Sequence, residues 1–144
     1  MSVYARYKKS PEGFRSLVEL LETTPTSRRQ KMIDIGMEED PIYTERALAL
    51  ILNFQDIMDL PPLELAELMA EAQPKMTAFA LNQASDEVKT RFIKNCKPQI
   101  AAQIKDYLTM KIGLREVGGA QLKLIEAARK LEKRGLLKVK RIPA

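Results

Sequence analysis

Residues 48–62 read LALILNFQDIMDLPP, and this stretch decides how the chain is organised. An apolar run from Leu48 to Leu52 ends at Asn53 and is followed by few strong helix formers. The double proline Pro61-Pro62 cannot lie inside a helix, because proline lacks a backbone N–H and its ring clashes with the preceding turn. The stretch therefore predicts a joint between two lobes. We read Asn53 to Ile57 as this joint.

Signals for the start of a helix recur on both sides of the joint. Most consist of a polar or small residue followed by a proline. Proline suits the first position of a helix, because the N–H that it lacks needs no partner there. These pairs are Ser10-Pro11, Thr24-Pro25, Asp40-Pro41, Gln73-Pro74 and Lys97-Pro98. Ser85 is a further candidate cap, with two acidic residues in the turn after it. Apolar residues recur at helical spacing after these starts, and no hairpin or β-α-β pattern is present, so the fold class is all-α.

Short connections between the expected helices favour antiparallel neighbours stacked in pairs, as in helical bundles and α-solenoids. We predict an N-terminal helical lobe at 1–52, a hinge at 53–61 and a C-terminal helical lobe at 62–144. The last helix is expected to end at Gly135, with a short extended tail over 136–142.

Composition excludes several classes of function. The 144 residues contain no His, which removes the commonest general base and metal ligand, and the single Cys96 permits neither an internal disulfide nor a cysteine metal cluster. We therefore expect no enzyme activity, no cofactor and no metal, and we expect Cys96 to be a buried structural thiol. No apolar run is long enough to span a bilayer and residues 1–10 lack a signal-peptide core, so a cytoplasmic location is expected.

Charge is unevenly distributed along the chain. The net charge is +5, yet residues 34–71 hold ten acidic residues and one basic residue, while 111–144 hold ten basic and three acidic residues. The basic quarter contains no aromatic residue, and the acidic segment would oppose a polyanion, so nucleic acid is disfavoured as a partner. Opposed charges of this kind suit contacts between protein surfaces better.

The expected helix from Pro98 to Met110 carries the most informative surface. Its inward face holds Ile100, Ile104 and Leu108. Another face aligns four side chains, of which only one is charged: Gln99, Gln103, Asp106 and Met110. Without further information this is an ordinary polar helix face.

The order of several motifs resembles the C-terminal region of the FliG family of bacterial flagellar motor switch proteins. The resemblance covers about 11–140 and rests on GFRSLV at 13–18, MEEDP at 37–41, ILNFQDI at 51–57, ALNQASDEVK at 80–89, FIKN at 92–95 and RKLEKRG at 129–135. It implies an armadillo-like first lobe and a terminal helical lobe whose surface helix meets the stator. Between them it implies a hinge at Ile51, Leu52, Asn53 and Phe54. The family's N-terminal and middle domains have no counterpart here, which leaves a stand-alone divergent paralogue or a fragment.

The resemblance also implies which residues form the interface. The family's charged positions fall on Asn82, Gln99, Asp106 and Tyr107, and Arg115 lies near a family arginine, so most of the charges are absent. The implied function is a non-enzymatic interaction module in or near the flagellar rotor, with weaker charge pairing to the stator. The expected partners are other rotor or switch proteins, the cytoplasmic loop of the stator and a second copy through lobe stacking or swapping.

The expected location is the cytoplasm, at the cytoplasmic face of the inner membrane if the chain is associated with a motor. Two other functions stay open at this point. The chain could be a stand-alone adaptor for a different cytoplasmic assembly, or a small helical nucleic-acid-binding protein.

Overall fold

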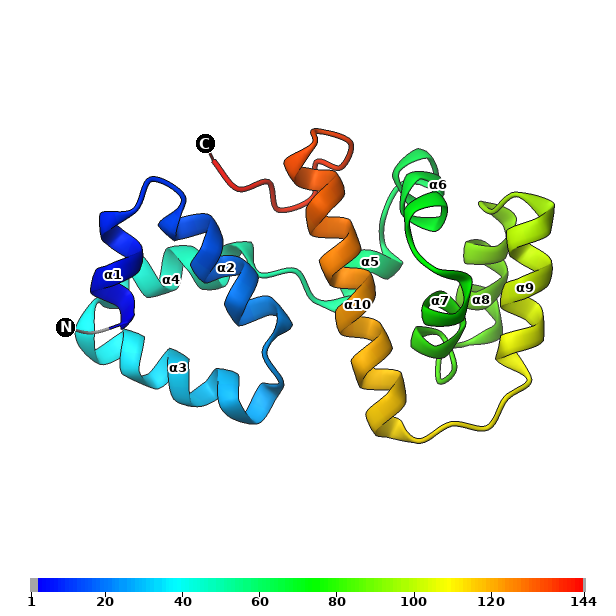
Figure 1. The fold of residues 1–144 in the computed structure, drawn as a ribbon, viewed down its shortest axis with the longest axis horizontal. Helices are drawn as coiled ribbons and strands as arrows, with labels where there is room; N and C mark the ends of the chain where they lie inside the picture. Colours follow the sequence, from blue (N-terminus) through cyan, green and yellow to red (C-terminus); the bar gives the residue numbers. More distant parts are fainter. Residues whose placement is uncertain (1–2, 144) are drawn as a thin grey trace. The chain divides into compact units, whose positions relative to one another are not determined.

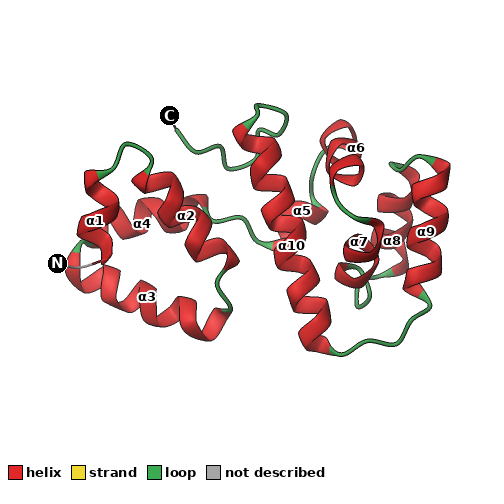
Figure 2. Cartoon of the chain, viewed as in Figure 1, coloured by secondary structure: helices red, strands yellow, loops and turns green. Residues whose placement is uncertain are grey.

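The computed structural model describes residues 3–143, and in this range every regular element is a helix (Figures 1 and 2). The all-α prediction is confirmed. No helix among the described residues is long and apolar enough to cross a membrane.

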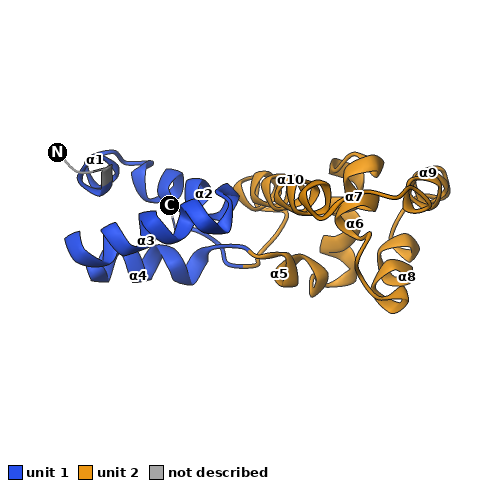
Figure 3. Cartoon of the chain, turned by 90° about the horizontal axis from the view of Figure 1, so that it is seen from below, with its two compact units in different colours: residues 1–52, 140–144 blue, residues 53–139 orange. Residues whose placement is uncertain are grey.

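The chain divides into two compact units, shown in different colours in Figure 3. Unit 1 comprises Met1–Leu52 together with Lys140–Ala144, and unit 2 comprises Asn53–Val139. The predicted second lobe at 62–144 includes the last residues of the chain, whereas Lys140–Ala144 group with unit 1. The physical reason is Ile142, which is only 2% exposed because it packs in the core of unit 1.

Unit 1 contains four helices. They are α1 (Val3–Lys9), α2 (Gly13–Thr23), α3 (Thr26–Glu39) and α4 (Pro41–Leu50). The core of unit 1 forms where the apolar face of α2 meets α1, α4 and the C-terminal tail. The buried residues of this core are Tyr4, Leu17, Val18, Leu21, Ala47, Ile51 and Ile142. Helix α1 was not expected from sequence, because its apolar content is low and its buried anchor is a tyrosine.

Helix α3 approaches α1 and α4 closely at Gly36. A Cβ atom added there would clash with the ring of Tyr4 and with the hydroxyl of Thr44. The same tyrosine donates a hydrogen bond of 2.6 Å from its hydroxyl to the carbonyl oxygen of Met32. Gly36 is therefore required for space rather than for backbone conformation.

The proline and aspartate signal before α4 works as expected. Pro41 occupies the first turn of α4, and Oδ1 of Asp40 accepts the backbone N–H of Tyr43 at 3.2 Å. Lys8 on α1 forms an ion pair with the same Asp40. This ion pair and the N–H of Tyr43 lower the pKa of Asp40 below its ordinary value of 3.8.

Unit 2 contains six helices. They are α5 (Phe54–Met58), α6 (Pro62–Glu71), α7 (Pro74–Ala80), α8 (Asp86–Lys94), α9 (Pro98–Leu108) and α10 (Leu114–Lys133). Helix α7 packs against both α9 and α10, and the residues buried between α7 and α10 include Phe79, Ala80, Ala120 and Leu124. Prolines in the first turn of α7 and α9 and the Ser85 cap of α8 agree with the sequence signals, and Pro62 occupies the first turn of α6 in the same way.

The short helix α5 lies within the segment that was predicted as a hinge. Arg91 on α8 fixes the connection from α5 to α6, because its guanidinium donates to the carbonyl oxygens of Met58 and Leu60. The segment between the two predicted lobes is thus folded and held by unit 2. Sequence alone did not show this, because the arginine is more than thirty residues away in the chain.

Helix α10 ends as its sequence predicts. Gly135 has φ of +81°, a backbone conformation that favours glycine, and the N–H of Leu136 bonds to the carbonyl oxygen of Leu131 at 2.9 Å. Leu136 bends and Val139 and Lys140 form a turn, so the extended tail that the sequence suggested is interrupted, and the other described residues after Gly135 have no regular structure.

Candidate functional site

Helix α9 presents the exposed line that the sequence picked out. Ile104 is fully buried, which turns the opposite side of the helix outward. Gln99, Gln103 and Asp106 are all exposed on α9, and we call these three side chains the α9 face. Its two amides can donate and accept hydrogen bonds, and its carboxylate can accept a charge-assisted bond from a basic partner.

Met110 is not on this helix, which corrects the predicted range of Pro98 to Met110. Helix α9 ends at Leu108, since the hydroxyl of Thr109 bonds to the carbonyl oxygen of Asp106 at 2.7 Å and closes the last turn. The carbonyl oxygen of Met110 instead accepts a bond of 3.4 Å from the amide of Asn82. The structure therefore brings Asn82 to the chain just beyond the C-terminal end of α9.

Tyr107 on α9 is partly buried, and Arg115 lies on a different helix from the α9 face. The ring of Tyr107 is half-buried and meets the ring of Phe79 edge-on, with centroids 6.2 Å apart, so this side chain belongs to the packing between α7 and α9. Arg115 is exposed in the first turn of α10, where Glu116 accepts the N–H of Gly113 at 3.3 Å.

The four predicted hinge residues fall on both sides of the unit boundary. In unit 1, Leu52 is fully buried and its N–H donates to Oε1 of Glu22 at 3.1 Å. In unit 2, Asn53 caps α5 in a reciprocal capping box, in which Asn53 and Asp56 each accept the other's backbone N–H at 2.9 Å. The first crossing between the units therefore falls between Leu52 and Asn53.

The outer two hinge residues are also fixed within their own units. The carbonyl oxygen of Ile51 accepts a bond of 2.9 Å from Nζ of Lys140 in the C-terminal tail. Phe54 packs against the cluster formed by Phe79, Ala80, Ala120 and Leu124 in unit 2. These contacts leave little of the predicted 53–61 segment free to bend.

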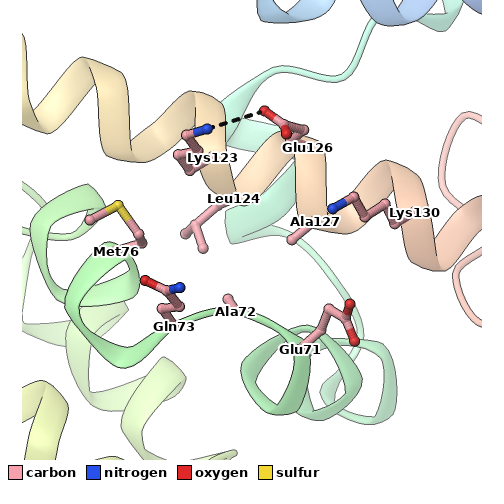
Figure 4. A pocket seen from close by; sticks show the side chains of 9 residues that line it. All are labelled: Glu71, Ala72, Gln73, Met76, Lys123, Leu124, Glu126, Ala127 and Lys130. Carbon is pink, nitrogen blue, oxygen red and sulfur yellow. Dashed lines mark ion pairs between the residues drawn. The ribbon is translucent and has the colours of Figure 1, made fainter.

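Sequence reasoning missed a groove in unit 2, formed by the connection from α6 to α7 and by one side of α10 (Figure 4). It has a volume of about 430 Å³ and is lined by Glu71, Ala72, Gln73, Met76, Lys123, Leu124, Glu126, Ala127 and Lys130. Lys123 and Glu126 pair at 3.9 Å, and their side chains remain 64% and 49% exposed. It is therefore an open groove with charged edges rather than an enclosed ligand cavity.

Buried polar residues on helices α2 and α10 were also missed. Glu22 is fully buried, and Arg129 pairs with Glu132 at 2.9 Å with both side chains almost fully buried. Helical spacing could have indicated that Glu22 is buried, because it follows Val18 by four residues and so lies on the same apolar face of the helix.

Cys96 is half-buried rather than fully buried. Its thiol lies 3.3 Å from the carbonyl oxygen of Phe92, and burial raises its pKa. A thiol of this kind is less reactive than an exposed one, in line with the expected structural role.

The fold and these surfaces define an all-helical protein built from two small helical units, with a polar helix face as its candidate contact site. The family model of the FliG C-terminal domain matches residues 37–139, which is most of the chain. The chain belongs to the FliG C-terminal domain family.

Two relatives are flagellar motor switch proteins named FliG. The chain is 28% identical over 131 residues to the one from Thermotoga maritima, which covers 90% of this chain and 39% of the relative. It is 23% identical over 130 residues to the one from Aquifex aeolicus, which covers 89% of this chain and 40% of the relative. The chain thus spans about two fifths of the length of these relatives.

Solved structures of FliG share the fold. A crystal structure of residues 86–343 of FliG from H. pylori aligns with a TM-score of 0.64 at 19% identity, covering 87% of this chain and 60% of that one. Full-length FliG from Aquifex aeolicus aligns with a TM-score of 0.55 at 23% identity, covering 88% of this chain and 40% of that one.

Proposed function

We propose that this chain is a non-enzymatic protein-interaction module of the flagellar motor switch, placed at the cytoplasmic face of the inner membrane. The observation that carries this proposal is the family match over residues 37–139, which includes α9 and the unit boundary. Membership of this family favours a motor role over a separate adaptor or a nucleic-acid-binding protein. The partners we propose are other rotor or switch proteins and the cytoplasmic loop of the stator.

The α9 face is the proposed contact site for the stator loop. Asp106 is the only charge on this face, so one charge-assisted bond and several amide bonds would carry the contact. Because few charges take part, binding should depend less on salt than binding through a row of ion pairs.

Binding of the purified full chain to an immobilised stator-loop peptide tests this site. We expect Asp106→Lys to weaken binding at least tenfold, and Glu67→Lys, the same charge change at an exposed position of α6, to leave it unchanged. Equal loss in both variants, or none in either, would refute the site. If tagged protein never colocalises with motors and a deletion strain swims normally, the motor role itself is wrong.

Unit 1 is the proposed site of lobe stacking between copies. Large apolar side chains are exposed on α3 and α4, with Ile35 51% exposed and Ile42 73% exposed. Apolar surface of this kind is often covered by a partner. Light scattering over a concentration series should show a dimer or chain that Ile42→Asp disrupts, whereas a monomer at all concentrations would contradict stacking.

The two units are proposed to reorient through the backbone dihedral angles on either side of the rigid peptide bond between Leu52 and Asn53, namely ψ of Leu52 and φ of Asn53. The supporting observation is that folded, hydrogen-bonded structure reaches this bond from both sides. A change of orientation would therefore be absorbed by very few backbone angles, as in hinge motions of other proteins.

A further inference from the structure

The C-terminal tail passes from unit 2 into unit 1 within very few residues. Leu137 is buried, and the N–H of Lys138 donates to Oε1 of Glu64 on α6 at 2.9 Å, so the chain is still held by unit 2 here. Lys140 has φ of +43°, a left-handed conformation that turns the backbone, and it already belongs to unit 1. Only Val139 separates these two anchors.

Inside unit 1, contacts from Lys140 and Ile142 bind the tail. Nζ of Lys140 donates to the carbonyl oxygen of Ile51 at 2.9 Å. Ile142 is 2% exposed and packs with Tyr4, Leu17 and Leu21 in the core. The guanidinium of Arg15 on α2 lies 3.4 Å from the carbonyl oxygen of Ile142.

The exposure pattern identifies Ile142 as the anchor of the tail. Its neighbours Arg141 and Pro143 are exposed, so a single apolar side chain enters the core of unit 1. Burying one isoleucine contributes about 1.5–3 kcal/mol, which is small enough for the tail to detach without complete unfolding.

The chain therefore connects the two units twice. One connection is the bond from Leu52 to Asn53, and the other is the tail at Val139. A body held at one point can rotate about it, whereas a body held at two points has far less freedom. The tail thus has a direct effect on how far the first connection can act as a hinge.

We propose that unit 1 carries a docking site for the segment Lys140 to Ile142, and that the chain's own tail, seated in this site, is a reversible latch on the hinge. With the tail docked, the two units keep a narrow range of orientations. With the tail released, the backbone angles that flank the peptide bond between Leu52 and Asn53 are the single remaining pivot. The latch rests on the hinge of the proposed function, but not on the stator contact.

Pulsed electron paramagnetic resonance on the full chain tests the latch. Spin labels are attached at Ser27→Cys on α3 and Thr90→Cys on α8, both exposed, in a Cys96→Ala background. We compare Ile142→Asp with Pro143→Asp, a matched control that places the same charge one residue further on. NMR order parameters of the tail report whether it is docked, with about 0.85 for rigid backbone and below about 0.6 for a flexible segment.

We expect Ile142→Asp to release the tail and at least to double the width of the distance distribution, while Pro143→Asp changes neither. A tail that is flexible in the unmodified chain, or one that Ile142→Asp releases without widening the distribution, would overturn the latch. A dimer in light scattering that Ile142→Asp converts to a monomer, and Ile42→Asp does not, would show that the tail is exchanged between copies and would also overturn the latch.

Two further results keep the test decisive. If hydrogen exchange shows that Ile142→Asp unfolds unit 1, the milder variant Ile142→Ala is used in its place. A wider distance distribution on release of the tail again supports the latch, and an unchanged one again overturns it. A distribution already broad while the tail is docked would refute the latch and leave the hinge standing. A distance distribution that stays narrow after the tail is released would refute both the latch and the hinge. Neither of these two results affects the proposal that the α9 face binds the stator peptide.

Discussion

The backbone N–H of Leu52 donates a hydrogen bond of 3.1 Å to Oε1 of Glu22, and both residues are fully buried in unit 1. Leu52 follows the end of α4, so its N–H has no partner in the helix. A buried carboxylate supplies the acceptor that this donor needs. Glu22 therefore fixes the point at which the chain leaves the unit.

Glu22→Ala should destabilise unit 1 by about 1–3 kcal/mol, because it leaves a buried backbone donor without its acceptor. Urea unfolding followed by circular dichroism, with hydrogen exchange to locate the effect, measures this. The control is Glu19→Ala on the same helix, whose side chain is 42% exposed and whose ion pair with Arg15 spans 3.8 Å. A surface pair contributes about 0–1 kcal/mol, so an equal loss in both variants would contradict the role of Glu22.

Removing the cap at the unit boundary should loosen α5. Asn53→Ala deletes the acceptor for the N–H of Asp56 and should cost about 1 kcal/mol. Asn53→Asp keeps an acceptor at the same place and should be close to neutral. Hydrogen exchange of the α5 amides measures the difference between the two variants. Equal protection of these amides in the alanine and aspartate variants would contradict the prediction.

Two glycines should respond in opposite directions to the same change. Gly36→Ala forces a methyl group against Tyr4 and Thr44 and should destabilise unit 1 by about 1–3 kcal/mol. Gly118→Ala in α10 meets no atom within 4 Å and should stabilise unit 2 by about 1 kcal/mol, because alanine favours the helix. Thermal unfolding of both variants tests the pair. If the melting temperature shifts in the same direction in both variants, the close packing at Gly36 is contradicted.

Local rules were enough to predict most of the helices and the exposed line of α9. Proline and cap signals act over three or four residues, so Pro41, Pro98 and Ser85 could be interpreted without knowledge of the fold. The end of α9 was placed two residues too late, because it depends on a hydroxyl of Thr109 and not on an apolar period.

Long-range contacts account for what the sequence did not reveal. Ile142 lies 127 residues from Arg15, and Arg91 lies 33 residues from Met58, so no spacing rule connects either pair. The family resemblance places Tyr107 at an interface, and spacing did not reveal that its half-buried ring also packs edge-on against Phe79. Whether a polar or aromatic side chain faces a partner or its own core depends on the helix that packs against it.

The ion pair between Lys8 and Asp40 should make unit 1 sensitive to acid. The pKa of Asp40 is lower in the folded state than its ordinary value of 3.8, first because of Lys8 and then because of the N–H of Tyr43. Its contribution to stability is therefore present above pH 3.8 and is lost as the pH falls through the folded pKa.

Lys8→Met should raise the pKa of Asp40 toward 3.8 and reduce this acid dependence, while Lys31→Met, at an exposed position of α3, should not. NMR titration of the Asp40 carboxyl carbon, with thermal unfolding from pH 2 to pH 7, measures both effects. The remaining bond from Tyr43 keeps the pKa below its ordinary value in the variant, so the shift should be partial. An Asp40 that titrates at or above 3.8 in the unmodified chain would show that the pair does not form in solution.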